Sequence, residues 1–122
     1  MRIKSLLFYF ICCLFFTTLN AQVYNMGNNS VTNAAGTLYD SGGQLGAYGN
    51  GQNFTFTICP TGNPACIQMV FTQFALENNF DFLYIYDGPT TASPLIGTYT
   101  GTTSPGTVQA TSGCITIRFT SD

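Results

Sequence analysis

Ser41 has the neighbours most typical of a nucleophilic serine, because Asp40 precedes it and Gly42 and Gly43 follow it. Such a serine needs a base beside it, and histidine is the usual base at neutral pH. The 122 residues contain no histidine, and Lys4 lies in an N-terminal segment that we expect to be removed. The sequence therefore predicts that the chain is not an enzyme and that the glycine pair serves a tight turn.

The N-terminus has the organisation of a secretory signal peptide, which we place at residues 1–21. Arg2 and Lys4 form a short basic head, an apolar run continues to Phe16, and Ala21 offers a small residue for cleavage. The apolar run is shorter than the roughly 20 residues that a membrane-spanning helix needs. We therefore expect a secreted or cell-surface protein without membrane insertion after signal removal.

Removal of that segment leaves one cation, Arg118, against five acids, which is a net charge of −4. Lys and Arg side chains neutralise the phosphates of bound nucleic acids, and anionic membranes attract the same residues. The charge balance therefore excludes nucleic acids and anionic membrane surfaces as partners. The acids that remain are Asp40, Glu77, Asp81, Asp87 and Asp122.

Cysteine usage fits export. Cys12 and Cys13 would leave with the signal peptide, and Cys59, Cys66 and Cys114 would remain. Disulfides are the default state of cysteines in an oxidising compartment. Cys59 and Cys66 flank a turn-rich connection that contains two prolines and a glycine. We therefore predict a Cys59–Cys66 disulfide, which leaves Cys114 without a partner.

The chain between the cysteines reads as β-structure. Apolar and polar residues alternate with period two, as in strands with one face in a core and one face in solvent. Glycine and proline punctuate these stretches, and no helical period is present. The pattern predicts a single all-β domain folded as an antiparallel sandwich. The predicted strands cover Asn53–Cys59, Cys66–Phe71, Phe82–Tyr86 and Ile115–Thr120.

The alternating pattern is weaker at the N-terminal boundary of this domain, and its C-terminal boundary coincides with the chain end. Residues 22–38 are predicted to form a loop-rich N-terminal segment with at most short edge strands, near Val23–Tyr24 and Thr37–Tyr39. The domain itself is expected at residues 39–122. Its last apolar strand stands directly before the chain end, which would leave a strand edge exposed. Together with the unpaired cysteine, this favours a domain whose final strand is missing.

Several stretches resemble the CUB domain in order and spacing, from about Tyr39 to Asp122. The most specific parts are the Tyr-Asp-Gly at the end of one strand and the terminal Phe-x-Ser-Asp. The Tyr39–Gly43 stretch and the short spacing from Glu77 to Asp81 resemble CUB variants of exported bacterial proteins. The stretches are Tyr39–Gly43, Phe71–Glu77, Phe80–Gly88, Leu95–Gly97 with Gly101, and Ile117–Asp122.

The resemblance implies a jelly-roll-like antiparallel sandwich that serves extracellular recognition. It also implies a Ca²⁺ site, for which the matching positions are Glu77, Asp81 and Asp122. Three hard carboxylates suit Ca²⁺, and without a cation they would repel one another. The sequence departs from the family where Asn78 and Asn79 replace a usual cysteine. The spacing from Glu77 to Asp81 is also short, which makes Glu77 the weakest of the three assignments.

Three further features carry alternative interpretations. Asp87 precedes Gly88 and Pro89 and is expected to cap its own turn rather than contact a partner. Phe82, Tyr84 and Tyr86 form an aromatic row opposite Leu83 and Ile85, either packed beneath neighbouring loops or exposed as a recognition surface. Arg118 either pairs with an acid on the outer sheet face or contacts an anionic ligand.

The leading functional hypothesis is a calcium-dependent module that binds an extracellular protein or carbohydrate, as in cell adhesion. The second hypothesis is an accessory domain of a larger secreted enzyme, such as a peptidase, whose catalytic part lies elsewhere. A structural spacer is the third. Sandwich folds host many functions, so the fold alone does not choose among them.

Overall fold

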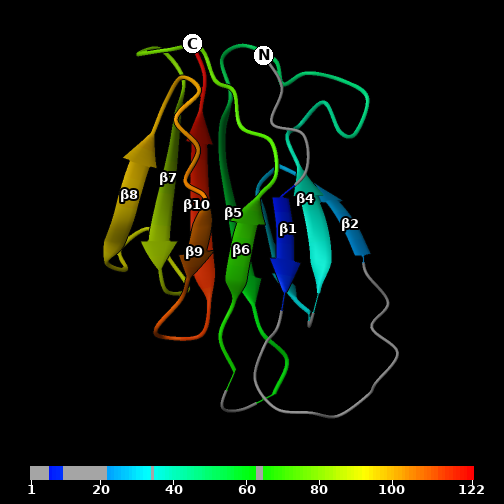
Figure 1. Ribbon diagram of the computed structural model, residues 1–122, viewed down its shortest axis with the longest axis vertical. Helices are drawn as coiled ribbons and strands as arrows, with labels where there is room; N and C mark the ends of the chain where they lie inside the picture. The colour runs from blue at the N-terminus through cyan, green and yellow to red at the C-terminus, as the bar shows by residue number, and fades with distance from the viewer. Residues whose placement is uncertain (1–5, 10–21, 34, 63–64) are drawn as a thin grey trace.

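The computed structural model describes residues 6–9, 22–33, 35–62 and 65–122. Within them the chain forms two five-stranded sheets that face each other as a sandwich (Figure 1). These residues contain no helix, and so no helical segment among them could cross a membrane. The predicted all-β sandwich is confirmed.

The first sheet has the strand order β2-β4-β1-β6-β9 and the second the order β3-β5-β10-β7-β8. The strands of the first sheet are β1 (Leu6–Tyr9), β2 (Gln22–Asn25), β4 (Gly36–Tyr39), β6 (Gln68–Phe71) and β9 (Thr107–Gln109). Those of the second are β3 (Asn29–Thr32), β5 (Asn53–Cys59), β7 (Phe82–Asp87), β8 (Leu95–Tyr99) and β10 (Ile115–Thr120).

Most neighbouring strands pair antiparallel, with β10 at the centre of the second sheet between β5 and β7. Two edge strands differ from the predicted antiparallel pattern, because β2 runs parallel to β4 and β3 runs parallel to β5. The β3 strand was not predicted. Its residues are polar apart from Val31, as suits an edge strand that is largely exposed.

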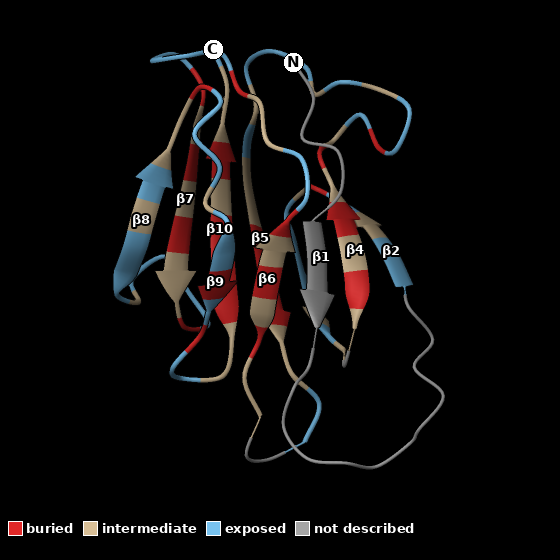
Figure 2. Cartoon of the chain, in the orientation of Figure 1, coloured by how far each residue is buried: buried red, intermediate tan, exposed pale blue. Residues whose placement is uncertain are grey.

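The core lies between the sheets, where the predicted alternation places one face of each central strand (Figure 2). In β10, Ile115, Ile117 and Phe119 are almost completely buried, and Leu83 and Ile85 of β7 pack beside them. Residues facing away from the core are mostly half-buried or exposed. Burial of these side chains supplies the main driving force for the sandwich.

The disulfide differs from the prediction: Cys59 bonds Cys114, and Cys66 is free. Ile58 and Ile115 face each other across β5 and β10, and the next facing pair is Cys59 and Cys114, with Cα atoms 4.2 Å apart. The connection from Cys59 to Cys66 instead crosses from β5 of one sheet to β6 of the other. It is therefore no hairpin turn, and the two cysteines that are near in sequence are not paired.

Most of the predicted signal peptide lies outside the described residues. The exception is β1, which pairs antiparallel with both β4 and β6 and so occupies the middle of the first sheet. Signal removal and the expected boundaries at residues 22, 38 and 39 stay predictions. In the segment expected to be loop-rich, the structure has β2, β3 and most of β4.

Candidate functional site

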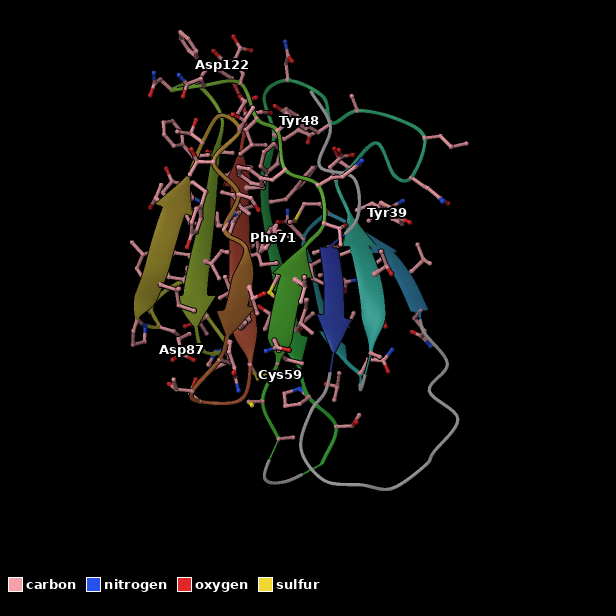
Figure 3. The ribbon with its side chains drawn as sticks, in the orientation of Figure 1. Tyr39, Tyr48, Cys59, Phe71, Asp87 and Asp122 are labelled. Carbon is pink, nitrogen blue, oxygen red and sulfur yellow. A yellow bond between two sulfur atoms is a disulfide. The ribbon has the colours of Figure 1, made fainter. Side chains whose placement is uncertain are left out.

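The three acids that the sequence singled out lie at one end of the sandwich, which we call the acidic end. Asp81 precedes β7, and Asp122 follows β10, which runs antiparallel to β7. Glu77 lies one tight turn before Asp81, whose amide donates to the carbonyl oxygen of Glu77 at 3.0 Å. Asp122 and Tyr48 share this end, while Cys59 and Asp87 lie at the opposite end (Figure 3).

Asp81 is the buried member of the group, with 3% of its surface exposed. Its Oδ2 accepts a hydrogen bond from the hydroxyl of Tyr48 at 2.5 Å. Its Oδ1 accepts from the backbone N–H of Asp122 at 3.2 Å. Both carboxylate oxygens therefore have protein donors, as a buried charge requires.

Tyr48 connects Asp81 to Glu77. Its hydroxyl accepts a hydrogen bond from the backbone N–H of Glu77 at 3.1 Å while it donates to Asp81. Its ring packs edge-on against Phe119, with the ring centroids 4.9 Å apart. Burial, followed by the hydrogen bond to Asp81, raises the pKa of Tyr48 far above its usual value, so the hydroxyl stays protonated and remains a donor.

The side chains of Glu77 and Asp122 are exposed, unlike that of Asp81. Within the described ranges, no three His, Cys, Asp or Glu side chains are gathered closely enough to hold a metal ion. The structure thus brings the main chains of the three acids together, and it links Asp81 directly to Tyr48. The donor chemistry suits Ca²⁺, whereas the carboxylates of Glu77 and Asp122 do not converge on Asp81.

Sequence reasoning missed Tyr48. It is the aromatic residue of the loop between β4 and β5, which otherwise consists largely of Gly, Ser, Gln and Asn. An aromatic side chain in such a loop is a signal that it packs against the core, but its hydroxyl partner is 33 residues away in the sequence. That distance hides the contact from any local pattern.

The Asp40–Gly43 segment forms the tight turn that its glycines predicted. The Gly42 amide donates to Oδ1 of Asp40 at 2.8 Å, and Gly43 has a φ of 73°. A φ in this left-handed region favours glycine. The hydroxyl of Ser41 donates to Oε1 of Gln52 at 2.7 Å, so Ser41 fastens the turn to the start of β5.

Asp87 lies at the end opposite the acids, where its carboxylate caps the distant loop at Thr111 and Ser112, whereas the sequence predicted that it would cap its own turn. Its carboxylate accepts hydrogen bonds from the backbone and hydroxyl groups of both Thr111 and Ser112. The hydrogen bond from the Thr111 hydroxyl is the main cause that lowers the pKa of Asp87, with the backbone amides adding to it. Asp87 thereby fixes the loop between β9 and β10 against the end of β7.

A scan against protein families matches residues 27–122 to the CUB domain. This chain belongs to the CUB family. The match begins at Gly27, upstream of the predicted domain start at Tyr39, and so includes β3 and β4. CUB domains are typically non-catalytic modules that mediate extracellular protein interactions within larger proteins, and some of them bind calcium.

Three curated proteins are similar in sequence to this chain. Exoskeleton protein RP43 of Riftia pachyptila is 33% identical over 100 residues, which are 74% of this chain and 23% of that protein. Human cubilin is 37% identical over 79 residues, 62% of this chain and 2% of cubilin. Tolloid-like protein 2 of Mus musculus is 29% identical over 96 residues, 75% of this chain and 9% of that protein. This CUB domain spans less than a quarter of each.

Proposed function

We propose that this CUB domain is a secreted or cell-surface recognition module whose acidic end binds Ca²⁺ and a protein or carbohydrate partner. The observation that carries the proposal is the buried carboxylate of Asp81, held by Tyr48 and by the amide of Asp122. A buried acid at an end formed by loops, with the main chains of two further acids beside it in space, is a costly arrangement that a bound cation would stabilise.

Charge balance supports this proposal. Arg118, the cation of the described region, lies on the outer face of the second sheet, where it contacts Tyr84 and Asn53. The acids at the acidic end therefore lack a basic protein partner in this part of the chain. Because Glu77 and Asp122 are exposed, their side chains can rotate toward Asp81 at little cost in packing. Bound Ca²⁺ would offset two of the three negative charges and order the loops that carry the carboxylates.

Two apolar side chains at this end favour a macromolecular partner. Phe80, next to Asp81, is 58% exposed, and Leu45, in the loop that carries Tyr48, is 89% exposed. Exposed large apolar side chains beside a charged site are typical anchors of protein interfaces. The loops of the acidic end would thus supply both the cation site and the contacts to the partner.

Thermal unfolding in millimolar calcium and then in chelator tests the metal site. Calcium at ten times its dissociation constant should stabilise the fold by about 1.4 kcal/mol, which raises Tm by several degrees. Asp81→Ala and Asp122→Asn should abolish the calcium-dependent rise. Asp87→Asn, which removes an acid from the opposite end, should retain it. Identical melting with calcium and with chelator up to several millimolar would refute the calcium site.

The alternative is an accessory domain of a larger secreted enzyme, such as a peptidase. It is favoured by the small share of each relative that this chain covers, because those relatives contain much sequence outside the matched region. The sequence of the complete gene separates the two proposals. A catalytic motif elsewhere in the polypeptide would favour the accessory role, whereas further adhesive modules would favour recognition.

A further inference from the structure

The outer face of the second sheet carries a row of aromatic side chains. Phe82, Tyr84 and Tyr86 of β7 are half-buried and alternate with Leu83 and Ile85, which are buried in the core. The rings of Phe82 and Tyr84 lie 6.2 Å apart with an angle of 34° between their planes. The two rings therefore form a nearly continuous aromatic surface on the solvent side of the sheet.

Arg118 lies on the same face, beside Tyr84. The β10 register places Arg118 between Tyr84 of β7 and Thr55 of β5. Its guanidinium carbon is 5.7 Å from the centroid of the Tyr84 ring, and its Nε donates to Oδ1 of Asn53 at 3.1 Å. These two contacts hold the planar guanidinium in one orientation without using its terminal nitrogens.

The terminal N–H groups of Arg118 are thus available for an anion. A guanidinium fork binds a carboxylate through two parallel hydrogen bonds, and an orientation fixed in advance reduces the entropy lost on binding. The sequence contains five acids, but the described contacts of Arg118 are with the aromatic ring of Tyr84 and the side-chain amide of Asn53. A carboxylate of a ligand would complete its coordination.

The groups around Arg118 indicate the class of ligand. Thr98 of β8 faces Tyr84 and Thr55 of β5 faces Arg118, and the two threonines are fully and partly exposed, respectively. Near the C-terminal end of β7, the carbonyl oxygen of Gly88 accepts a hydrogen bond from the buried hydroxyl of Thr116. The loop after β7 therefore covers this end of the sheet face. The open part is a shallow surface of two aromatic rings, hydroxyl groups and one oriented cation.

We infer that this surface, formed by Phe82, Tyr84, Arg118, Asn53, Thr55 and Thr98, binds a carbohydrate through one of its carboxylate groups. The C–H faces of sugar rings are apolar and would stack on Tyr84 and Phe82, while a sugar carboxylate accepts from Arg118. Threonine hydroxyls and the Asn53 amide would bond to sugar hydroxyls. This site adjoins the acidic end, because Phe82 directly follows Asp81 in the chain, but it uses none of the three acids and requires no calcium.

Titration of the protein with oligogalacturonate in the presence of chelator tests the inference, followed by tyrosine fluorescence and by NMR shifts of β7 and β10 amides. We expect saturable binding that weakens with salt, because a charge pair at an exposed site is screened. A neutral glucose oligomer of equal length should bind at least tenfold more weakly.

The variants assign the contacts. Arg118→Gln and Tyr84→Ala should each weaken binding about tenfold or more, whereas Tyr84→Phe, which keeps the ring, should retain most of the affinity. Thr107→Ala, on β9 of the other sheet, should leave it unchanged. Lack of binding at millimolar oligogalacturonate, or equal binding by Arg118→Gln, would overturn the inference. Equal binding of polyglutamate at the same surface would overturn the carbohydrate assignment. Loss of calcium binding in a separate experiment would leave this result unaffected.

Discussion

Tyr48 makes the buried charge of Asp81 tolerable. The phenol donates one hydrogen bond to Asp81 and accepts another from the amide of Glu77, so one side chain satisfies two polar groups at the acidic end. A phenol is protonated at physiological pH even at its ordinary pKa, and the raised pKa of Tyr48 keeps this donor in place in more alkaline solution. We therefore regard Tyr48 as the residue that positions Asp81.

Tyr48→Phe tests that role. The variant keeps the ring that packs on Phe119 but leaves Oδ2 of Asp81 without its donor. A buried acceptor that loses its partner costs about 1–3 kcal/mol, and urea unfolding should show a decrease of this size. Tyr84→Phe makes the same chemical change on the outer sheet face and should leave stability nearly unchanged. Equal losses in both variants would contradict the positioning role.

Asp87 makes the free energy of unfolding depend on pH in the acidic range. Its pKa is lowered in the folded state, so its stabilising contribution is complete above the unfolded value of 3.8 and is lost as the pH falls through the lower folded value. Asp87→Asn should therefore lower the free energy of unfolding by about 1 kcal/mol at pH 7, a modest figure because solvent screens the site.

Urea unfolding of both proteins between pH 7 and pH 2 provides the measurement. The difference between wild type and Asp87→Asn should shrink as the pH falls below about 4, where the unfolded carboxyl protonates. A difference that stays constant down to pH 2 would show that the hydrogen bonds to Thr111 and Ser112 do not depend on the charge.

Individual residues were predictable from sequence where their role is local. The Asp40–Gly43 turn depends on its immediate neighbours in the chain and has the expected role, whereas the carboxylate of Asp87 caps a loop 24 residues away instead of its own turn. Tyr48 and the partner of Cys59 depend on strands that are distant in sequence. Such contacts follow from register, which local composition does not specify.

At the level of the elements, the disulfide joins the end of β5 to the start of β10 across 55 residues. Closing a loop of this length should stabilise the fold by about 4 kcal/mol on the loop-entropy model. Cys114→Ser should lose most of that stability in non-reducing urea unfolding. Cys66→Ser, which changes the free cysteine, should lose little. Similar losses in both variants would indicate that Cys66 takes part in the bond.

The central strands were predictable, and the edge strand β2 was expected near Val23–Tyr24, whereas the edge strands β3, β8 and β9 were not expected. β5, β7 and β10 have one buried face, which produces clear alternation in their sequences. β3 and β9 contribute few core side chains, so their sequences carry little periodicity. The parallel direction of β2 and β3 is set by how the chain crosses between the sheets, which no local pattern encodes.

At the scale of the whole molecule, the sheet order has its main consequence at β1, which is the middle strand of the first sheet. It lies between β4 and β6, and it comes from the segment that we expect to be removed. In a protein that begins at Gln22, the amides of β4 and β6 should exchange with deuterium much faster than in the full-length chain. Those of β5 and β10, in the other sheet, should keep more of their protection. Equal protection in both sheets would show that the gap between β4 and β6 is closed in another way.

The pairing of β1 also bears on the order of events during export. A chain that folded before its leader was cut would hold that leader by hydrogen bonds on both sides, out of reach of a processing protease. Productive secretion would then require translocation to outrun folding. If the chain is exported as the sequence predicts, the disulfide favours this order, because disulfides such as Cys59–Cys114 form in an oxidising compartment. We therefore expect slow folding of the reduced precursor to be a functional property of this protein.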